Sequence, residues 1–312
     1  MKYFVYVNKL IGVETNQNHF KWNFGSFAPE STYQAFSECL IRIKLNICKE
    51  KELFGEAKEH KLDGRFRRFG INENEVSFRQ KIGFINFGYR VTILDNLIEA
   101  NVGKNYYLWV KYKIMNVHPI WYVLYDIVSC LLLKSNLMVL YGSAVETEPG
   151  KATVFMGAPG VGKTITATTL CKTKKFKMIA EDLLITDGQK VWPVPYTDTY
   201  RGDCNSNGIS FTDNPSQIEK IILLEQGCKS EISKEELLHK AVLLNRYNVL
   251  FYSSPTMIAY NYYKPDFSLD TLFETEKQIF DKMFGAIKCC SLHSDNPVSF
   301  VNEYLNSESS VR

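Results

Sequence analysis

The sequence of 312 residues lacks an excess of charge of either sign, and it lacks a long hydrophobic run. Its 37 Lys and Arg residues nearly balance 34 Asp and Glu residues, for a formal net charge of +3. Proteins that bind nucleic acids or membrane surfaces usually carry a marked basic excess, so we expect neither partner. The most apolar segment, Ile120 to Leu133, has about 14 residues and contains Asp126, whereas a membrane-spanning helix needs roughly 20.

Paired cysteines are also absent. The eight cysteines show no CxxC spacing and no histidine partners at metal-ligand intervals: Cys39, Cys48, Cys130, Cys171, Cys204, Cys228, Cys289 and Cys290. This pattern argues against a structural zinc site and against a disulfide framework. The N-terminal segment lacks the long apolar core and small-residue cleavage site of a secretory leader. We therefore expect reduced thiols and a cytoplasmic location.

Residues 1–116 are rich in β-branched and aromatic residues and contain no chemical motif. Strand-like segments include Lys2–Val7, Glu75–Gln80, Gly83–Leu94 and Asn105–Ile114, with turn-forming residues between them. We predict a β-rich N-terminal domain over this range, which binds the substrate or mediates assembly.

From residue 117 onward, short apolar runs alternate with segments of helical periodicity. The local signals are, in chain order, a helix opened by proline at Ile120–Lys134, a hairpin turn at Asp187-Gly188, a capping box at Ser233 and Glu236, and an amphipathic helix over Phe267–Ile287. We predict a mixed α/β catalytic domain over 117–312.

The strongest chemical signal is the segment GAPGVGKT, residues 157–164, which matches G-x-x-x-x-G-K-[ST] in full. A strand-like run, Thr153–Met156, leads into it, and a helical run, Ile165–Leu170, leads out of it. Glycines let successive backbone N–H groups converge on phosphate oxygens, and the helix that follows directs its N-terminal dipole at the same anion. The predicted nucleotide-binding residues are Gly157, Ala158, Pro159, Gly160, Val161, Gly162, Lys163, Thr164 and Ile165.

Two side chains of this phosphate loop have separate tasks. Lys163 is placed to reach the β- and γ-phosphates, and the Thr164 hydroxyl is a ligand for Mg²⁺. Neither an [NT]-K-x-D guanine-reading sequence nor an LSGGQ sequence follows the loop. These absences favour a kinase or an ATP-gated regulator over a GTPase or a transporter subunit, with ATP and Mg²⁺ as cofactors.

Four lysines follow the loop and its helix: Lys172, Lys174, Lys175 and Lys177. Cations are stabilised near the C-terminus of a helix by its dipole. We therefore interpret this run as solvated charges at the end of the helix.

Two adjacent carboxylates, Glu181 and Asp182, follow the short apolar run Met178–Ala180. After a phosphate loop, an acid at the end of a strand is expected to hold Mg²⁺, directly or through water, and a second acid can serve as general base for a hydroxyl nucleophile. In a regular strand these two side chains would point to opposite faces. Both can serve one site only if the chain turns at this point.

Together these segments resemble the catalytic domain of the HPr kinase/phosphorylase family and its smaller relatives, among them serine kinases and peptide-tailoring kinases such as the lasso-peptide kinases. The resemblance rests on Tyr141-Gly142-Ser143-Ala144-Val145-Glu146, the phosphate loop and Ile179-Ala180-Glu181-Asp182, and it covers roughly residues 138–225. It implies an α/β fold, with a mixed-sheet P-loop kinase domain related to phosphoenolpyruvate carboxykinase. By this resemblance, Lys163 holds the phosphates, Thr164 and Asp182 hold Mg²⁺, and Glu181 is the base.

The sequence departs from the family pattern at three places. Glu181 stands where the family usually has Asp, and Tyr141 stands where it commonly has His. A tyrosine of ordinary pKa, about 10, cannot shuttle protons at neutral pH as a histidine does. The HPr enzymes also carry Glu-Ile-Arg-Gly-Leu-Gly, whereas the nearest segment here, Asp198–Asp203, has Thr199 in place of the glutamate and retains Arg201. We expect kinase chemistry without phosphorylase activity, with Arg201 stabilising charge on the transferring phosphoryl group.

The leading hypothesis is an ATP-dependent kinase that transfers the γ-phosphoryl group to a serine-type hydroxyl of a peptide or protein, with Mg²⁺. That peptide or protein is the expected partner, and the sequence leaves a homo-oligomer open. A close variant is a kinase for free L-serine or another small metabolite. The alternative from a different class is a nucleotide-binding regulatory or scaffold protein without phosphoryl transfer, which the departures at Tyr141, Glu181 and Thr199 motivate.

Overall fold

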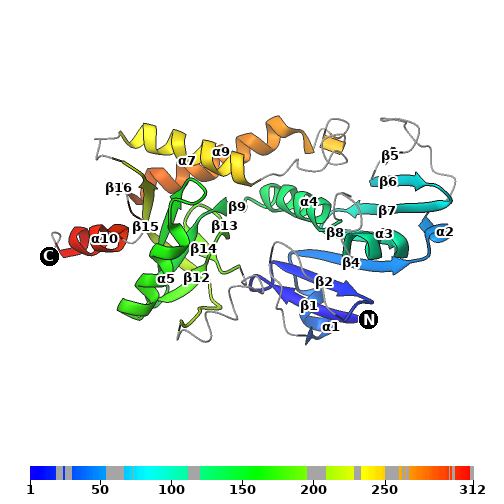
Figure 1. Ribbon diagram of the computed structural model, residues 1–312, viewed down its shortest axis with the longest axis horizontal. Coiled ribbons are helices and arrows are strands. Elements are labelled where there is room, and N and C mark those ends of the chain that lie inside the picture. Colours follow the sequence, from blue (N-terminus) through cyan, green and yellow to red (C-terminus); the bar gives the residue numbers. More distant parts are fainter. Residues whose placement is uncertain are drawn as a thin grey trace. The chain divides into compact units, whose positions relative to one another are not determined.

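The computed structural model describes residues 1–18, 24, 30–53, 67–72, 74–111, 120–194, 209–227, 233–249, 260–261, 264, 267–294, 296 and 299–309. Within these residues the chain has an α/β fold with two mixed β-sheets (Figure 1). Contacts divide the chain into two units, residues 1–132 with 251–272, and residues 133–250 with 273–312. The boundary expected between residues 116 and 117 lies outside the described residues.

The first unit is built on a sheet of eight strands in the order β3-β1-β2-β4-β8-β7-β6-β5. The strands are β1 (Lys2–Tyr6), β2 (Ile11–Thr15), β3 (Glu30–Ser31), β4 (Ile41–Cys48), β5 (Arg67–Asn72), β6 (Glu75–Ile82), β7 (Ile85–Leu94) and β8 (Leu97–Gly103). Central strand β4 is parallel to both of its neighbours, β2 and β8. Buried and half-buried side chains alternate along most of β4, so one face of the sheet packs into the core. This agrees with the β-rich character expected of the N-terminal region.

The described helices of this unit are α1 (Tyr33–Ser37), α2 (Glu50–Leu53), α3 (Lys104–Lys111) and α4 (Ile120–Lys134), the last of which ends in the second unit. Helix α4 begins directly after Pro119, as the sequence predicts. None of the helices among the described residues is long and apolar enough to cross a membrane.

The predicted strand Asn105–Ile114 is wrong, because α3 occupies residues Lys104–Lys111. Aromatic residues favour strands on their own, but here two of them lie one helical turn apart. Tyr106 is fully buried with its ring 5.4 Å from that of Tyr89, and the ring of Trp109 lies 4.1 Å from that of Phe87. The Glu50 carboxylate also accepts a hydrogen bond from the Asn105 N–H at 2.5 Å. These contacts with distant residues override the local preference.

The second unit contains a sheet in the order β12-β10-β11-β15-β14-β13-β9, with β16 pairing to β15 outside this path. The strands are β9 (Met138–Tyr141), β10 (Ser143–Glu148), β11 (Lys151–Gly157), β12 (Lys177–Ala180), β13 (Leu183–Thr186), β14 (Lys190–Trp192), β15 (Ser216–Glu225) and β16 (Lys288–His293). Strands β11, β15 and β16 run parallel to one another. Strands β13 and β14 pair antiparallel around Asp187-Gly188, which confirms the predicted hairpin.

Helices cover both faces of this second sheet (Figure 1). They are α5 (Lys163–Lys174), α7 (Lys234–Asn248), α9 (Leu269–Ala286) and α10 (Ser299–Ser309). Helices α5 and α10 bury a core against one face, in which Phe155, Leu170 and Phe300 are fully enclosed. Helices α7 and α9 lie together over the other face, and Ser233 caps α7 by accepting from the Glu236 N–H at 3.1 Å. The predicted cap is therefore confirmed.

The six cysteines among the described residues, Cys39, Cys48, Cys130, Cys171, Cys289 and Cys290, are free thiols. Burial raises the pKa of the Cys39 and Cys289 thiols to about 11 in each case, which makes them poor nucleophiles at neutral pH. Cys204 and Cys228 lie outside the described residues.

Candidate functional site

The phosphate loop joins the end of β11 to the start of α5, as its sequence predicts. Gly157 has a φ of 151°, and a Cβ there would come within 2.6 Å of the carbonyl oxygen of Leu224 on the neighbouring strand β15. Gly162 caps the N-terminus of α5 with a φ of 112°, a conformation that side chains rarely adopt. The two glycines thus let the loop turn tightly and leave the first N–H groups of α5 free to bind an anion.

Lys163 is buried at the base of this loop, with 4% of its surface exposed. Its ammonium group donates hydrogen bonds to the carbonyl oxygens of Gly157 and Ala158, at 3.1 Å each. It also lies 4.1 Å from the centre of the Tyr141 ring, in a cation–π contact. Burial lowers the pKa of Lys163 to about 8, although the charge of Asp182 acts in the opposite direction. An anion bound beside the Lys163 ammonium group would therefore stabilise its charged form.

Glu181 and Asp182 lie in a bend between β12 and β13, outside either strand. The chain therefore turns where it must if both acids are to serve one site. The backbone of the pair is fixed by three donors. The Ser143 hydroxyl and the Thr164 hydroxyl, the latter at 3.4 Å, both donate to the carbonyl oxygen of Glu181, and the Gly142 N–H donates to that of Asp182 at 3.0 Å.

Thr164 thus connects the phosphate loop to the acid pair, although 17 positions separate it from Glu181 in sequence. The approach follows from the sheet, because residues 138–148 and 177–186 run antiparallel to each other as β9 against β13 and β10 against β12. The strands of both segments are interrupted at the same height in the sheet, one at Gly142 and the other at the acid pair. The structure therefore brings Lys163, Thr164, Glu181 and Asp182 close to one another.

The electrostatics of the acids differ from those of free carboxyl groups. Lost hydration, and secondly the charge of Asp182, raise the pKa of Glu181 to about 7. Lost hydration also raises the pKa of Asp182, while the Lys163 charge opposes that rise. Glu181 is half-buried and Asp182 is exposed. The arrangement provides one carboxyl that exchanges protons near neutral pH beside a second that is open to a cation.

Burial, together with the charge of Asp182, raises the pKa of Tyr141 to about 12. The phenol is therefore protonated throughout the neutral range and does not act as a proton shuttle. Its place in the site is structural and electrostatic, with the ring beneath the ammonium group of Lys163.

Asn245 on α7 positions Tyr141, a role that no pattern in the sequence indicates. Its amide oxygen accepts from the Tyr141 N–H at 2.8 Å, and its amide nitrogen donates to the Val139 carbonyl oxygen at 3.2 Å. The amide nitrogen also lies 3.2 Å from the carboxylate of Glu276 on α9, which pairs with Arg246 at 2.5 Å. Asn245 and Glu276 are fully buried. The capping box at Ser233 predicted the helix, but not which of its polar residues turns inward.

A cavity of about 840 Å³ opens beside the loop, between its tip, the end of β15 and α7. It is lined by Ala158, Pro159, Gly160, Val161, Leu223, Leu224, Glu225, Gln226, Lys240, Leu243, Leu244, Tyr247 and Asn248. Leu243 and Tyr247 are 55% and 79% exposed, so the cavity presents apolar surface from α7 to solvent. Within the cavity wall, Lys240 pairs with Glu225 at 2.8 Å. The sequence pattern of α7 identified neither apolar residue as part of a site.

The remaining predicted residues have simple outcomes. The four loop residues 158–161 line this cavity, whereas Ile165 is 45% exposed and does not. Arg201, and Thr199 beside it, lie outside the described residues.

The donor set fits the predicted magnesium ion. Mg²⁺ prefers oxygen ligands and is usually held by one or two carboxylates together with substrate phosphates and water. The Thr164 hydroxyl and the Asp182 carboxylate are oxygen ligands of this kind. Thr164 contacts the carbonyl oxygen of Glu181, which is the residue directly before Asp182. Among the residues described here, no cluster of three or more His, Cys, Asp or Glu side chains forms a metal site by itself. A cation at this place would therefore arrive with a phosphate ligand.

No known family model matches the chain, and no curated protein matches it either. The geometry of the site is therefore what indicates the function.

Proposed function

We propose that the chain is an ATP-dependent kinase that transfers the γ-phosphoryl group to a serine-type hydroxyl of a peptide or protein. The observation that carries this proposal is the approach of two carboxyl residues to the Thr164 end of a complete phosphate loop. A loop that only binds nucleotide does not need a carboxyl group of pKa about 7 beside it, whereas hydroxyl phosphorylation does need a base.

The phosphate-binding roles follow from the loop. The free N–H groups at the start of α5 would bind the phosphate oxygens, and Lys163 would exchange its contacts with the Gly157 and Ala158 carbonyls for the β- and γ-phosphates. The exposed Tyr247 and Leu243 of the neighbouring cavity offer an apolar surface for the nucleobase.

The carboxyl groups divide the remaining work. Asp182 and the Thr164 hydroxyl would hold Mg²⁺, which neutralises charge on the phosphates when it is bound. Glu181, with its raised pKa, would orient the acceptor hydroxyl and take up its proton. Arg201 stays a candidate for stabilising the transferring phosphoryl group, on its sequence position alone.

We also propose that the second unit is related to the HPr kinase/phosphorylase family and to phosphoenolpyruvate carboxykinase. Support comes from the order of features along the chain, namely strands β9 and β10 on either side of Gly142, the phosphate loop and the acid pair. The first unit would bind the substrate or mediate assembly, and the free thiols support a cytoplasmic location.

The test is transfer of label from γ-labelled ATP in the presence of Mg²⁺ to L-serine, serine-containing peptides and carrier proteins encoded beside the gene. We expect label on a serine hydroxyl with the wild type and none with Lys163→Ala. Glu181→Gln should lose transfer and keep its affinity for ATP. The matched control is Glu235→Gln, which changes an exposed carboxylate in the first turn of α7 and should transfer normally.

One observation favours the alternative of a nucleotide-binding scaffold. The Lys163 ammonium is already satisfied by two carbonyl oxygens and the Tyr141 ring, an arrangement that also suits a purely binding role. Tight ATP binding with no label on any acceptor or in inorganic phosphate would favour the scaffold over the kinase. Label on free L-serine alone would identify the small-metabolite variant of the kinase.

A further inference from the structure

Tyr141 brings a hydrogen-bond donor into the candidate site. The residue ends β9 and is half-buried. In the part of the chain that the structure describes, no group accepts a hydrogen bond from its phenol hydroxyl. A phenol of ordinary pKa, about 10, keeps its proton at neutral pH, and burial raises the pKa of Tyr141 further, to about 12. The hydroxyl is therefore a donor throughout the neutral range, and it is free to bind an acceptor on a ligand.

The backbone around Tyr141 is held on two sides. On one side, its N–H donates to the amide oxygen of Asn245, which is fully buried, at 2.8 Å. On the other side, Tyr141 is in register with Leu183 on the antiparallel strand β13. The next N–H along the chain, that of Gly142, donates to the carbonyl oxygen of Asp182 at 3.0 Å. The side chain thus starts from a fixed point beside the acid pair, as a preorganised donor requires.

The side chain of Tyr141 extends from this point toward the phosphate loop. Its ring centre lies 4.1 Å from the ammonium group of Lys163. A phosphate oxygen that bonds to this ammonium group lies about 2.8 Å from it, and is then near enough for the phenol hydroxyl to reach. The charge of Asp182 also acts on Tyr141, where it adds to the effect of burial on the pKa. Tyr141 therefore lies beside the residue that would hold the phosphates and beside one that would hold Mg²⁺.

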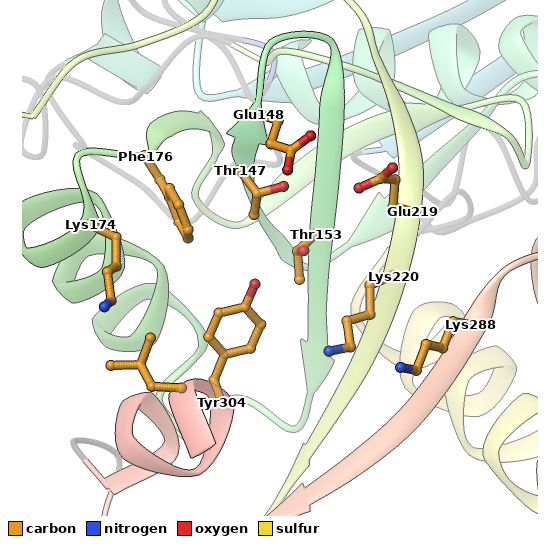
Figure 2. Close-up of a pocket in the computed structure, with 10 residues that line it drawn as sticks. Thr147, Glu148, Thr153, Lys174, Phe176, Glu219, Lys220, Lys288 and Tyr304 are labelled. Atoms are coloured by element: carbon orange, nitrogen blue, oxygen red, sulfur yellow. The ribbon is translucent and has the colours of Figure 1, made fainter. Parts of the chain in front are cut away.

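A second contact between a tyrosine and a lysine, elsewhere in the same unit, has a different setting. The ring centre of Tyr304 on α10 lies 5.3 Å from the Lys220 ammonium group, and both residues line a cavity of about 820 Å³ (Figure 2). Tyr304 is 3% exposed and packs edge-on against Phe155, with 5.9 Å between the ring centres. Among the described residues that line this cavity, none belongs to the phosphate loop or the acid pair. Contact with a lysine is therefore not enough to indicate a site, and the location of Tyr141 is what distinguishes it.

We propose that Tyr141 is a further catalytic residue, whose hydroxyl donates a hydrogen bond to a non-bridging oxygen of the γ-phosphoryl group of ATP. This role depends on the proposed kinase function of the chain. During transfer, the acceptor oxygen bonds to the γ-phosphorus, the bond from that phosphorus to the β–γ bridging oxygen breaks, and ADP leaves. The proton of the acceptor goes to Glu181, and Tyr141 keeps its own. The phenol thus stabilises charge on the phosphoryl oxygens without exchanging a proton.

The test variant is Tyr141→Phe, which removes the phenol oxygen and keeps both the ring beside Lys163 and the backbone bond to Asn245. The matched control is Tyr33→Phe, which makes the same change at a residue of α1 that is 63% exposed. Calorimetric titrations of the full-length protein with ATP and with ADP, in Mg²⁺ and without acceptor, measure contact with the γ-phosphoryl group separately from transfer. Initial rates with γ-labelled ATP give kcat, and circular dichroism checks that each variant is folded.

In Tyr141→Phe the affinity for ATP should fall about tenfold, because a hydrogen bond to a charged group is lost, while the affinity for ADP stays within twofold of wild type. The value of kcat should fall at least tenfold. Tyr33→Phe should match the wild type in every measurement. The role of Tyr141 is overturned if ATP affinity in Tyr141→Phe stays within twofold of wild type, if ADP affinity falls as much as ATP affinity, or if kcat is unchanged.

Failure of the proposed function gives a different result. A wild type that binds ATP and transfers no label to any acceptor contradicts the kinase, whatever Tyr141→Phe does. The ratio of ATP to ADP affinities then decides by itself whether the hydroxyl contacts the γ-phosphoryl group. A wild type that transfers label, with Tyr141→Phe equal to it in ATP affinity and in kcat, contradicts only the role of Tyr141.

Discussion

Two influences of opposite sign act on Lys163. Burial disfavours its charged form and brings its pKa to about 8, while Asp182 and the carbonyl oxygens of the loop favour that form. The pKa of Glu181 is shifted in the opposite direction, up to about 7. At neutral pH this carboxyl group is therefore divided between its protonated and its ionised form. Neighbouring groups whose pKa values are shifted toward each other are typical of catalytic sites. The dependence of activity on pH is therefore the measurement that tests these two residues.

The first prediction concerns the pH dependence of transfer. If Glu181 is the base, kcat/KM should rise tenfold per pH unit below about pH 7 and level off above it, because only the ionised carboxyl accepts a proton. Glu181→Gln should lower kcat by about 10² to 10⁴ and abolish that limb of the profile. Initial rates from pH 5 to 9 measure both effects. An unchanged limb in the variant would remove Glu181 from the role of base.

A second prediction concerns the apolar cavity beside the loop. Tyr247→Ala should weaken ATP binding about tenfold, since a base stacked on an aromatic ring gains about 1 to 3 kcal/mol. Tyr247→Phe keeps the ring and should bind ATP as the wild type does. Calorimetric titrations with ATP compare the two variants. Equal loss in both, or no loss in either, would place the nucleobase elsewhere.

At the scale of elements, the site depends on how α7 and α9 hold strand β9. The side chain of Asn245, on α7, bonds to the backbone of β9 at both Val139 and Tyr141. Because Tyr141 lies next to Lys163, the position of an edge strand is coupled to the phosphate loop. Glu276 and Arg246 complete the network, with the Arg246 guanidinium also stacked 4.2 Å from the Phe273 ring.

The third prediction tests that network. Asn245→Ala should lower the free energy of unfolding by about 2 to 4 kcal/mol, because it removes the hydrogen bonds to the backbone at Val139 and Tyr141 and one of the two partners of the buried Glu276 carboxylate. Asn248→Ala, three residues along the same helix, removes only a bond to the Leu244 carbonyl and should cost less than about 1 kcal/mol. Urea unfolding followed by circular dichroism compares the two. Similar losses of unfolding free energy in the two variants would contradict the role of Asn245 in holding β9.

At the scale of the whole molecule, the acid pair links global stability to pH. The folded-state pKa of Glu181, about 7, lies above the ordinary glutamate value of 4.5, so the folded protein binds the proton more tightly than the unfolded chain does. The stability contributed by this group is therefore fully present below about pH 4.5 and is lost as pH rises to about 7.

The fourth prediction follows from that sign. The difference in free energy of unfolding between the wild type and Glu181→Gln should shift against the wild type as pH rises from about 4.5 to 7, and stay constant above pH 7. Chemical unfolding at half-unit pH steps measures the difference. A difference that does not vary with pH, or one that moves in favour of the wild type, would contradict the raised pKa.

The sequence alone determined the features that depend on contiguous residues. The glycines and Lys163-Thr164 determine the phosphate loop because its conformation arises within eight residues, 157–164. The hairpin at Asp187-Gly188 and the cap at Ser233 are local for the same reason. The position of Glu181 and Asp182 after a short strand was enough to predict them as site residues. Whether the chain turns there, so that both side chains serve one site, could not be predicted from the local sequence.

The tertiary structure decided what depends on residues far apart in the chain. It joined Thr164 to the acid pair, turned Asn245 toward β9, and made residues 104–111 a helix because Glu50, Tyr89 and Phe87 supply contacts that a strand would lose. It also set the ammonium group of Lys163 beside the ring of Tyr141, although the two residues lie in separate segments. Strand register and helix packing are long-range properties, and the energies that select them come from partners that local sequence does not contain.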